Sequence, residues 1–132
     1  MRRTVLILAA VFLAMTGCES DKVLAGRKVL DEDPAKALEL FSQAAQERDP
    51  CFECLAYLGY ARERTGDLAG AAEAYARAAE LPDVQLRPEP VRERLLGVYE
   101  SLYNQADEAD QPALAEKAAR LEATLKVARP WA

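Results

Sequence analysis

The sequence predicts an all-α fold, a short stack of antiparallel helix hairpins, and three observations support this prediction. Alanine, the strongest helix former, accounts for 26 of the 132 residues. β-Branched residues never gather into the alternating runs that are typical of strands. A segment that begins near residue 24 also recurs further along the chain, which indicates that helices are repeated in pairs.

The first 17 residues have the pattern of a leader that is removed on export. Arg2 and Arg3 precede an apolar run, residues 5–15, whose eleven residues are too few to span a bilayer, because a spanning helix needs about 20. A charged start, a short apolar stretch and a small-residue exit are typical of a secretory signal peptide. We therefore expect no transmembrane helix in the mature protein.

A cysteine stands at the end of this leader, in the motif Met15-Thr16-Gly17-Cys18. The motif resembles the lipobox of bacterial lipoproteins, Leu-[Ala/Ser/Thr]-[Gly/Ala]-Cys, with methionine in place of the usual leucine. This resemblance implies that residues 1–17 are a lipoprotein signal peptide and that Cys18 carries diacylglyceryl and palmitate-type acyl chains. Such chains hold a protein to a membrane because each buried methylene contributes about 0.8 kcal/mol.

The charge of the mature chain supports attachment through lipid rather than through basic side chains. The formal net charge of −5 becomes −7 once Arg2 and Arg3 are removed, which argues against nucleic acid and anionic lipid headgroups as partners. In lipoproteins, aspartate after the acylated cysteine favours the inner membrane. Glu19 stands there, so we expect the periplasmic leaflet of the outer membrane.

Residues 18–132 contain two copies of one helical pattern. A single constant shift aligns Leu24 with Leu58, Asp33 with Asp67, Ala35 with Ala69, Ala37 with Ala71, Glu39 with Glu73, Phe41 with Tyr75, Ala44 with Ala78 and Ala45 with Ala79. Small alanines let neighbouring helices approach closely, and an aromatic side chain fills the remaining gap. Helix starts are marked by Asp33-Pro34, Asp49-Pro50 and Gly66-Asp67, which supply N-cap acceptors.

This pattern resembles the tetratricopeptide repeat (TPR), a helix-turn-helix unit of about 34 residues, the length of the shift between the two copies. The second unit, residues 51–84, matches the family at Leu55, Leu58, Gly59, Gly66, Asp67, Ala71, Tyr75 and Ala78. The first unit, residues 19–50, keeps Ala37, Phe41 and Ala44 but places Ala25 at the family's glycine. Residues 90–128 predict a divergent or capping hairpin, with apolar stripes at Leu95, Val98, Tyr99, Leu102, Ala106, Leu114, Ala118, Leu121 and Leu125.

In this family the first helices of the repeats line a concave face that binds peptides. Carried over by position, the candidate groove residues are Lys22, Gly26 and Val29 in the first unit, Ala56, Tyr60 and Glu63 in the second, and Arg94, Val98 and Ser101 in the third hairpin. A solvated face without a ligand is the alternative. Trp131 is either a recognition anchor or, as we favour, a side chain that packs over the last helix.

Cys51 and Cys54 lie at a predicted helix start with the spacing Cys-x-x-Cys. Export to an oxidising compartment favours a structural disulfide. Side chains at i and i+3 lie about 5 to 6 Å apart at Cβ in a regular helix, wider than the roughly 3.5 to 4.5 Å of a disulfide, so the first turn would have to adjust. Unpaired thiols that face the core and a redox dithiol remain open.

The chain contains no histidine, the commonest general base and metal ligand. It also lacks a phosphate-binding glycine loop and a nucleophile elbow. We expect no enzyme activity, no metal and no small-molecule cofactor. The predicted function is a membrane-anchored adaptor that binds a protein or peptide partner, including a pilotin-like assembly factor. The alternatives are a thiol-redox accessory protein that uses Cys51 and Cys54, or an envelope-structural protein that binds the cell wall.

Overall fold

The computed structural model describes residues 21–82, 84 and 89–128, and this part of the chain is helical, without a strand. The expected leader, Cys18 and Trp131 lie outside these residues. Six helices follow one another: α2 (Asp21–Val29), α3 (Pro34–Glu47), α4 (Phe52–Arg64), α5 (Leu68–Ala79), α6 (Val91–Gln105) and α7 (Gln111–Ala128). None of the described helices is long and apolar enough to cross a membrane.

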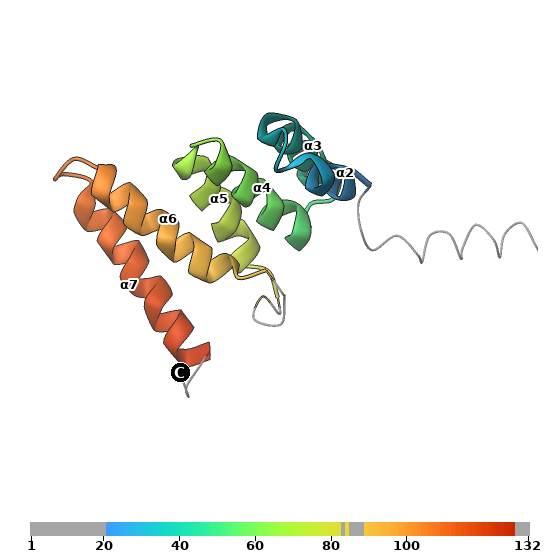
Figure 1. Ribbon diagram of the computed structural model, residues 1–132. Helices are drawn as coiled ribbons and strands as arrows, with labels where there is room; N and C mark the ends of the chain where they lie inside the picture. The colour runs from blue at the N-terminus through green and yellow to red at the C-terminus, as the bar shows by residue number, and fades with distance from the viewer. Residues whose placement is uncertain (1–20, 83, 85–88, 129–132) are drawn as a thin grey trace, which may run out of the picture.

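Each helix packs against its neighbour in sequence, from α2 against α3 to α6 against α7 (Figure 1). The helices therefore form three hairpins, α2–α3, α4–α5 and α6–α7, which follow one another along the stack. Helix α2 also contacts α4, so the first helices of the first two hairpins are neighbours. The prediction of an all-α stack of helix hairpins is confirmed.

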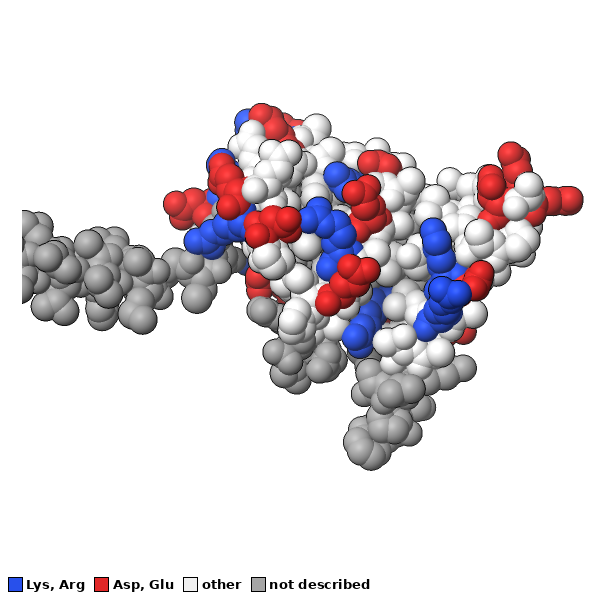
Figure 2. Space-filling model, turned by 180° about the vertical axis from the view of Figure 1, so that it is seen from behind, with Lys and Arg blue, Asp and Glu red and all other residues white. Residues whose placement is uncertain are grey.

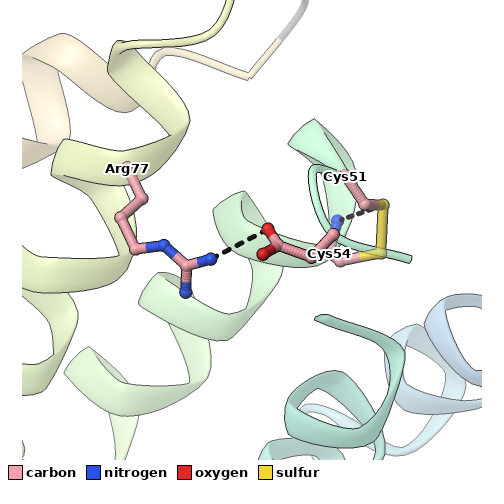
Figure 3. Close-up of a disulfide and its surroundings, with 4 residues drawn as sticks. Cys51, Cys54 and Arg77 are labelled. Carbon is pink, nitrogen blue, oxygen red and sulfur yellow. Dashed lines mark hydrogen bonds and ion pairs between the residues drawn. A yellow bond between two sulfur atoms is a disulfide. The ribbon is translucent and has the colours of Figure 1, made fainter. Parts of the chain in front are cut away.

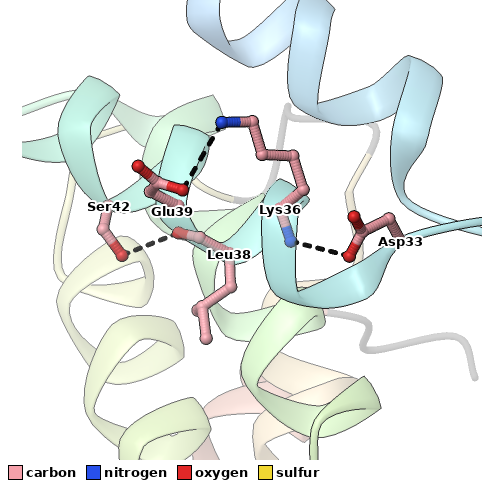
Figure 4. Close-up of polar contacts among 5 residues, drawn as sticks. All are labelled: Asp33, Lys36, Leu38, Glu39 and Ser42. Atoms are coloured by element: carbon pink, nitrogen blue, oxygen red, sulfur yellow. Dashed lines mark hydrogen bonds and ion pairs between the residues drawn. The ribbon is translucent and has the colours of Figure 1, made fainter.

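Local features mark where helices of the first two hairpins begin and end. The Asp33 carboxylate accepts the backbone N–H of Lys36 at 3.1 Å (Figure 4), and the Asp67 carboxylate accepts that of Gly70 at 2.9 Å. These aspartates are N-caps, as predicted. Helix α4 is followed by Gly66, whose φ of +86° is a left-handed conformation that suits glycine.

The expected N-cap at Asp49 is wrong. Helix α4 begins at Phe52, and Cys51 is its N-cap, with the Cys51 sulfur accepting the backbone N–H of Cys54 at 3.2 Å. The Asp49 carboxylate instead accepts from the Arg77 guanidinium of α5 at 2.9 Å. The cap lies two residues later than expected because the sulfur, and not the carboxylate, lies over the first turn.

Two glycines set the spacing within the first two hairpins. A Cβ atom on Gly26 would lie 2.5 Å from the Phe41 ring, and one on Gly59 would lie 2.6 Å from the Tyr75 ring. Phe41 and Tyr75 are both 0% exposed. Each aromatic ring therefore packs directly on the backbone of the preceding helix, and a side chain at either glycine would push the helices apart.

This contact corrects the expected register of the first hairpin. Gly26, not Ala25, occupies the position that Gly59 has in the second hairpin. The stretch from Gly26 to Phe41 is one residue shorter than the stretch from Gly59 to Tyr75, so a uniform shift cannot align both helices of the two hairpins. In agreement, Leu24 is 38% exposed, although the uniform shift aligns it with the buried Leu58.

The core is apolar within the described residues, and it runs from α2 into the first part of α6. Val91, Leu95 and Val98 of α6 are buried, whereas the expected stripe of α7, at Leu114, Ala118, Leu121 and Leu125, is only half-buried. The third hairpin is thus joined to the core mainly through α6. Helix α7 covers one side of α6 and ends the described stack.

Ion pairs connect successive hairpins across the surface. Arg64 of α4 pairs with Asp31 before α3 at 3.3 Å, and Arg94 of α6 pairs with Glu63 of α4 at 3.7 Å. Acidic and basic side chains are interspersed on the face that Figure 2 shows. Exposed pairs contribute about 0 to 1 kcal/mol each, so burial of the apolar core stabilises the stack more than these pairs do.

Candidate partner-binding pocket

A cavity of about 330 Å³ lies where α4 faces the start of α6. Helix α5 contributes the buried Tyr75 to its wall. The cavity combines apolar surface, aromatic rings and charged groups, and it is lined by Ala56, Tyr57, Tyr60, Tyr75, Glu89, Pro90, Val91 and Arg94. We call it the α4–α6 pocket.

Three of the expected groove residues meet in this pocket. Ala56 and Tyr60 lie on one face of α4, and Arg94 lies across from them on α6. Glu63, one helical turn after Tyr60, is connected to the pocket through its ion pair with Arg94. The family-based positions in the second and third hairpins therefore include residues that are adjacent in space.

The remaining groove candidates lie elsewhere. Gly26 is buried against the Phe41 ring, and Val98 is 3% exposed in the core, so neither presents a side chain to a groove. The expectation for these two residues is wrong. Lys22 forms an ion pair with Glu47 of α3, and Val29 packs partly buried against the core. The cause for the first hairpin is the register of α2. It turns Arg27 of α2 toward α4, with the Arg27 guanidinium 5.2 Å from the Tyr57 ring centre.

The Arg94 guanidinium contacts two neighbouring side chains, Tyr60 and Glu63. It lies 4.6 Å from the centre of the Tyr60 ring, within the range of a cation–π contact, and 3.7 Å from the Glu63 carboxylate. Burial raises the pKa of Glu63 above its ordinary value, and the positive charge of Arg94 opposes part of this rise. The pair therefore lies at the border between solvent and a less polar interior.

Two buried oxygen atoms of the pocket have no hydrogen-bond partner. They are the hydroxyl of Tyr75 and Oε2 of Glu89. Glu63 and Arg94 lie near enough to Tyr75 to affect its titration, but neither makes a hydrogen bond of acceptable geometry with its hydroxyl. Burial, with the negative charge of Glu63, raises the pKa of Tyr75. Since buried polar groups are normally paired, two orphaned atoms in the lining of one pocket are unusual.

A larger cavity of about 640 Å³ lies where α5, α6 and α7 meet. Its lining combines alanines, Tyr99, Leu102 and Leu114 with the polar residues Glu73, Gln105, Asp110 and Lys117. Neither of the orphaned buried oxygens belongs to its lining. Of these two cavities, only the smaller one is lined by residues with an unpaired buried oxygen. We therefore take the α4–α6 pocket as the candidate site.

Cys51 and Cys54 form a disulfide at the start of α4 (Figure 3). Their Cα atoms are 5.3 Å apart, within the usual range of roughly 4.4 to 6.8 Å. Cys51 has an extended backbone, with φ −132° and ψ 111°, and so lies outside the helix. The helical turn after it consequently does not have to adjust. Cys54 is 0% exposed.

The sequence contains no local signal for two residues of the site. Tyr75 matches the repeat pattern as a core aromatic, but its hydroxyl reaches a pocket formed by other helices. Glu89 stands just before α6 and belongs to no sequence motif. A buried tyrosine normally places its hydroxyl on a partner, and this general expectation is the only sequence-based signal for either residue. Among the described side chains, no group of three or more His, Cys, Asp or Glu is arranged to hold a metal ion.

Comparison with known proteins adds no family assignment. No family model, curated protein or solved structure matches the chain.

Proposed function

We propose that this chain is a lipid-anchored, protein-binding module of the bacterial cell envelope, without catalytic turnover. The observation that carries the proposal is the α4–α6 pocket, where Ala56, Tyr60 and Arg94 come together from two hairpins. Pockets with aromatic walls and a few polar groups are typical binding sites. Tyrosine and arginine are also enriched among the residues that dominate protein interfaces.

The envelope location of the module rests on the sequence. The motif at 15–18 resembles a lipobox, and the acidic mature chain offers no electrostatic attachment to anionic lipid. Acyl chains on Cys18 would keep the stack near the membrane surface, because only two residues separate this cysteine from α2. The TPR-like pairing of helices supports a role in binding a partner at this location.

The disulfide supports a structural role for the two cysteines. Cys54 is fully buried and Cys51 packs partly buried against the core, so the disulfide is part of the packed start of α4. Replacement of both Cys51 and Cys54 by alanine separates this role from a redox function. We expect partner binding to persist in the double variant, and loss of a redox phenotype together with intact binding would favour the redox alternative.

Site-specific photo-cross-linking in intact cells tests the proposal. A photoreactive phenylalanine derivative replaces Tyr60 in the pocket, and the same derivative replaces Ala123, an exposed residue of α7, as the matched control. We expect a discrete protein adduct from position 60 that is missing from position 123. Identical adduct patterns from both positions, or none from position 60, would contradict partner binding at this site.

A further inference from the structure

A second surface of the molecule lies between α5 and α7. Both helices pack against α6, which lies between them in Figure 1, whereas no comparable packing joins α5 to α7. The cavity of about 640 Å³ occupies this gap, and we call it the α5–α7 trough. The trough and the α4–α6 pocket share no lining residue. A ligand in the trough would therefore not contact the lining of the pocket.

Three helices in a row shape the trough. Along α5 and along α6 its lining includes residues at positions i, i+3 and i+7, and on α7 residues at i and i+3, so it follows about two helical turns, roughly 10 Å. The half-buried side chains of Tyr99 and Leu102 both pack against the core and line the trough. The residues with this spacing are Ala69, Ala72 and Ala76 of α5, Tyr99, Leu102 and Ala106 at the end of α6, and Leu114 and Lys117 of α7.

These walls suit a further helix. The alanine side chains of α5 are small enough to let a helix approach closely, while Tyr99, Leu102 and Leu114 supply large apolar surface. Four helices around a shared apolar core are a common arrangement, and α5, α6 and α7 supply three of them. An amphipathic helix in a groove buries its residues at i, i+3, i+4 and i+7. The trough therefore has the length and the spacing of a site for about two turns of a helix.

The charged side chains of the lining complement a basic helix. Glu73 of α5, Asp110 just before α7 and Lys117 of α7 are exposed, and none of them forms an ion pair with another described residue. The lining thus has two acids and one base. Glu73 would meet a lysine or arginine of the bound helix. Asp110 and Lys117 lie at opposite ends of the α7 wall, and they match a helix whose N-terminus lies at Asp110, because helix ends carry partial positive and negative charge in that order.

We propose that the α5–α7 trough binds an amphipathic helix of a partner protein, with apolar side chains of that helix on Leu102 and Leu114 and a basic side chain beside Glu73. A second copy of this chain is a poorer occupant. Among the described residues, Leu24 and Tyr103 are the only large apolar side chains that are exposed, and they lie on different helices. A second copy therefore presents no apolar helix face two turns long. This inference assigns a second surface and does not depend on the α4–α6 pocket.

Binding of a helical probe to the folded protein tests the inference. The probe is a blocked peptide of two repeats of Leu-Ala-Lys-Leu-Ala-Ala-Lys, whose leucines form one helix face. Its control has the same composition with the leucines spread around the helix, and a third peptide replaces lysine by glutamate. In NMR titrations at low salt we expect saturable shifts at Leu102 and Leu114, and at least about tenfold weaker binding of the control because leucine contacts are lost. The glutamate peptide should bind at least about threefold more weakly than the probe.

Matched variants locate the bound peptide. Ala69→Trp fills the trough from an exposed position, and Ala123→Trp places the same side chain on an exposed position of α7 outside the lining. We expect at least about tenfold weaker probe binding from the first and unchanged binding from the second. Glu73→Lys and Glu32→Lys change the net charge equally, but only Glu73 lies in the trough. We expect about threefold weaker binding from Glu73→Lys and little change from Glu32→Lys. All four positions are exposed, so wild-type circular dichroism is expected for each variant.

Several results would overturn the inference. They are absence of saturable binding, equal binding of the probe and its control, equal effects within either pair of variants, or tighter binding of the glutamate peptide. Concentration-dependent shifts at Leu102 and Leu114 without peptide would place a second copy of the chain in the trough, and would also overturn it. None of these results bears on the photo-cross-link from position 60, which tests the proposed function separately.

Discussion

The substitution Gly59→Ala tests the packing that defines the hairpins. The new Cβ would lie 2.6 Å from two carbon atoms of the Tyr75 ring, whereas favourable carbon–carbon contacts are about 3.5 to 4.0 Å. Tyr75 is 0% exposed, so a shift of its ring would disturb the side chains packed around it. Overpacking of this kind costs about 1 to 3 kcal/mol.

Gly97→Ala is the matched control, because Gly97 also lies inside a helix but nothing approaches within 4 Å of its Cβ position. Alanine is favoured over glycine in a helix by about 1 kcal/mol, and this gain is common to both variants. The difference between them therefore isolates the steric cost. We expect Gly97→Ala to be more stable than wild type, and Gly59→Ala to be less stable than Gly97→Ala by about 1 to 3 kcal/mol.

Urea unfolding followed by far-ultraviolet circular dichroism measures both free energies of unfolding. Equal slopes of the transitions would show that the variants unfold from equally compact states. If Gly59→Ala proved as stable as Gly97→Ala, the close contact between the α4 backbone and the Tyr75 ring would be refuted, together with the spacing of the second hairpin.

Three further predictions concern the site and its surroundings. Tyr75→Phe removes an unpaired buried hydroxyl, so its free energy of unfolding in urea should rise by about 1 kcal/mol; a decrease would show that the hydroxyl has a partner. Reduction of the Cys51–Cys54 disulfide opens no long loop and should lower stability by about 2 kcal/mol or less, with helical circular dichroism retained; loss of the helical signal would contradict its local role. Burial raises the pKa of Glu63, so the folded state binds the Glu63 proton more tightly than the unfolded state does. Wild type should therefore lose stability relative to Glu63→Gln as pH rises through the window just above 4.5. Parallel pH profiles of the two proteins would count against the burial of Glu63.

Local signals in the sequence predicted the helix starts where one side chain decides the structure. Asp33 and Asp67 are caps because each carboxylate is close in sequence to the N–H group that it accepts. The prediction of an N-cap at Asp49 was wrong because Cys51 lies closer to the first turn. A side chain from another helix, Arg77, also competes for the Asp49 carboxylate. The outcome depends on a residue 28 positions away, which no local pattern contains.

The repeat pattern predicted the hairpins but not the register of the first one. A uniform shift aligns the aromatic residues of the second helices correctly and misplaces Gly26 by one position. A change of one residue rotates a helix face by about 100°, so the candidate groove residues of α2 point elsewhere. In the second hairpin the register holds, and Ala56 and Tyr60 line the pocket.

The pocket itself depends on tertiary structure. Tyr60, Tyr75 and Glu89 come from three separate elements, and the orphaned state of two of their oxygens follows only from what surrounds them in the folded chain. Neither composition nor spacing reports the burial of a single oxygen atom. The identity of such a site is therefore readable in the structure and not in the sequence.

The anchored location of this module is the claim on which its proposed role depends most. Intact mass spectrometry of the protein purified from detergent-extracted membranes tests this claim directly. We predict a chain that begins at Cys18 and carries the added mass of diacylglycerol and a further acyl chain. A chain that retains Met1, or a mature product without acyl mass on its first residue, would contradict it.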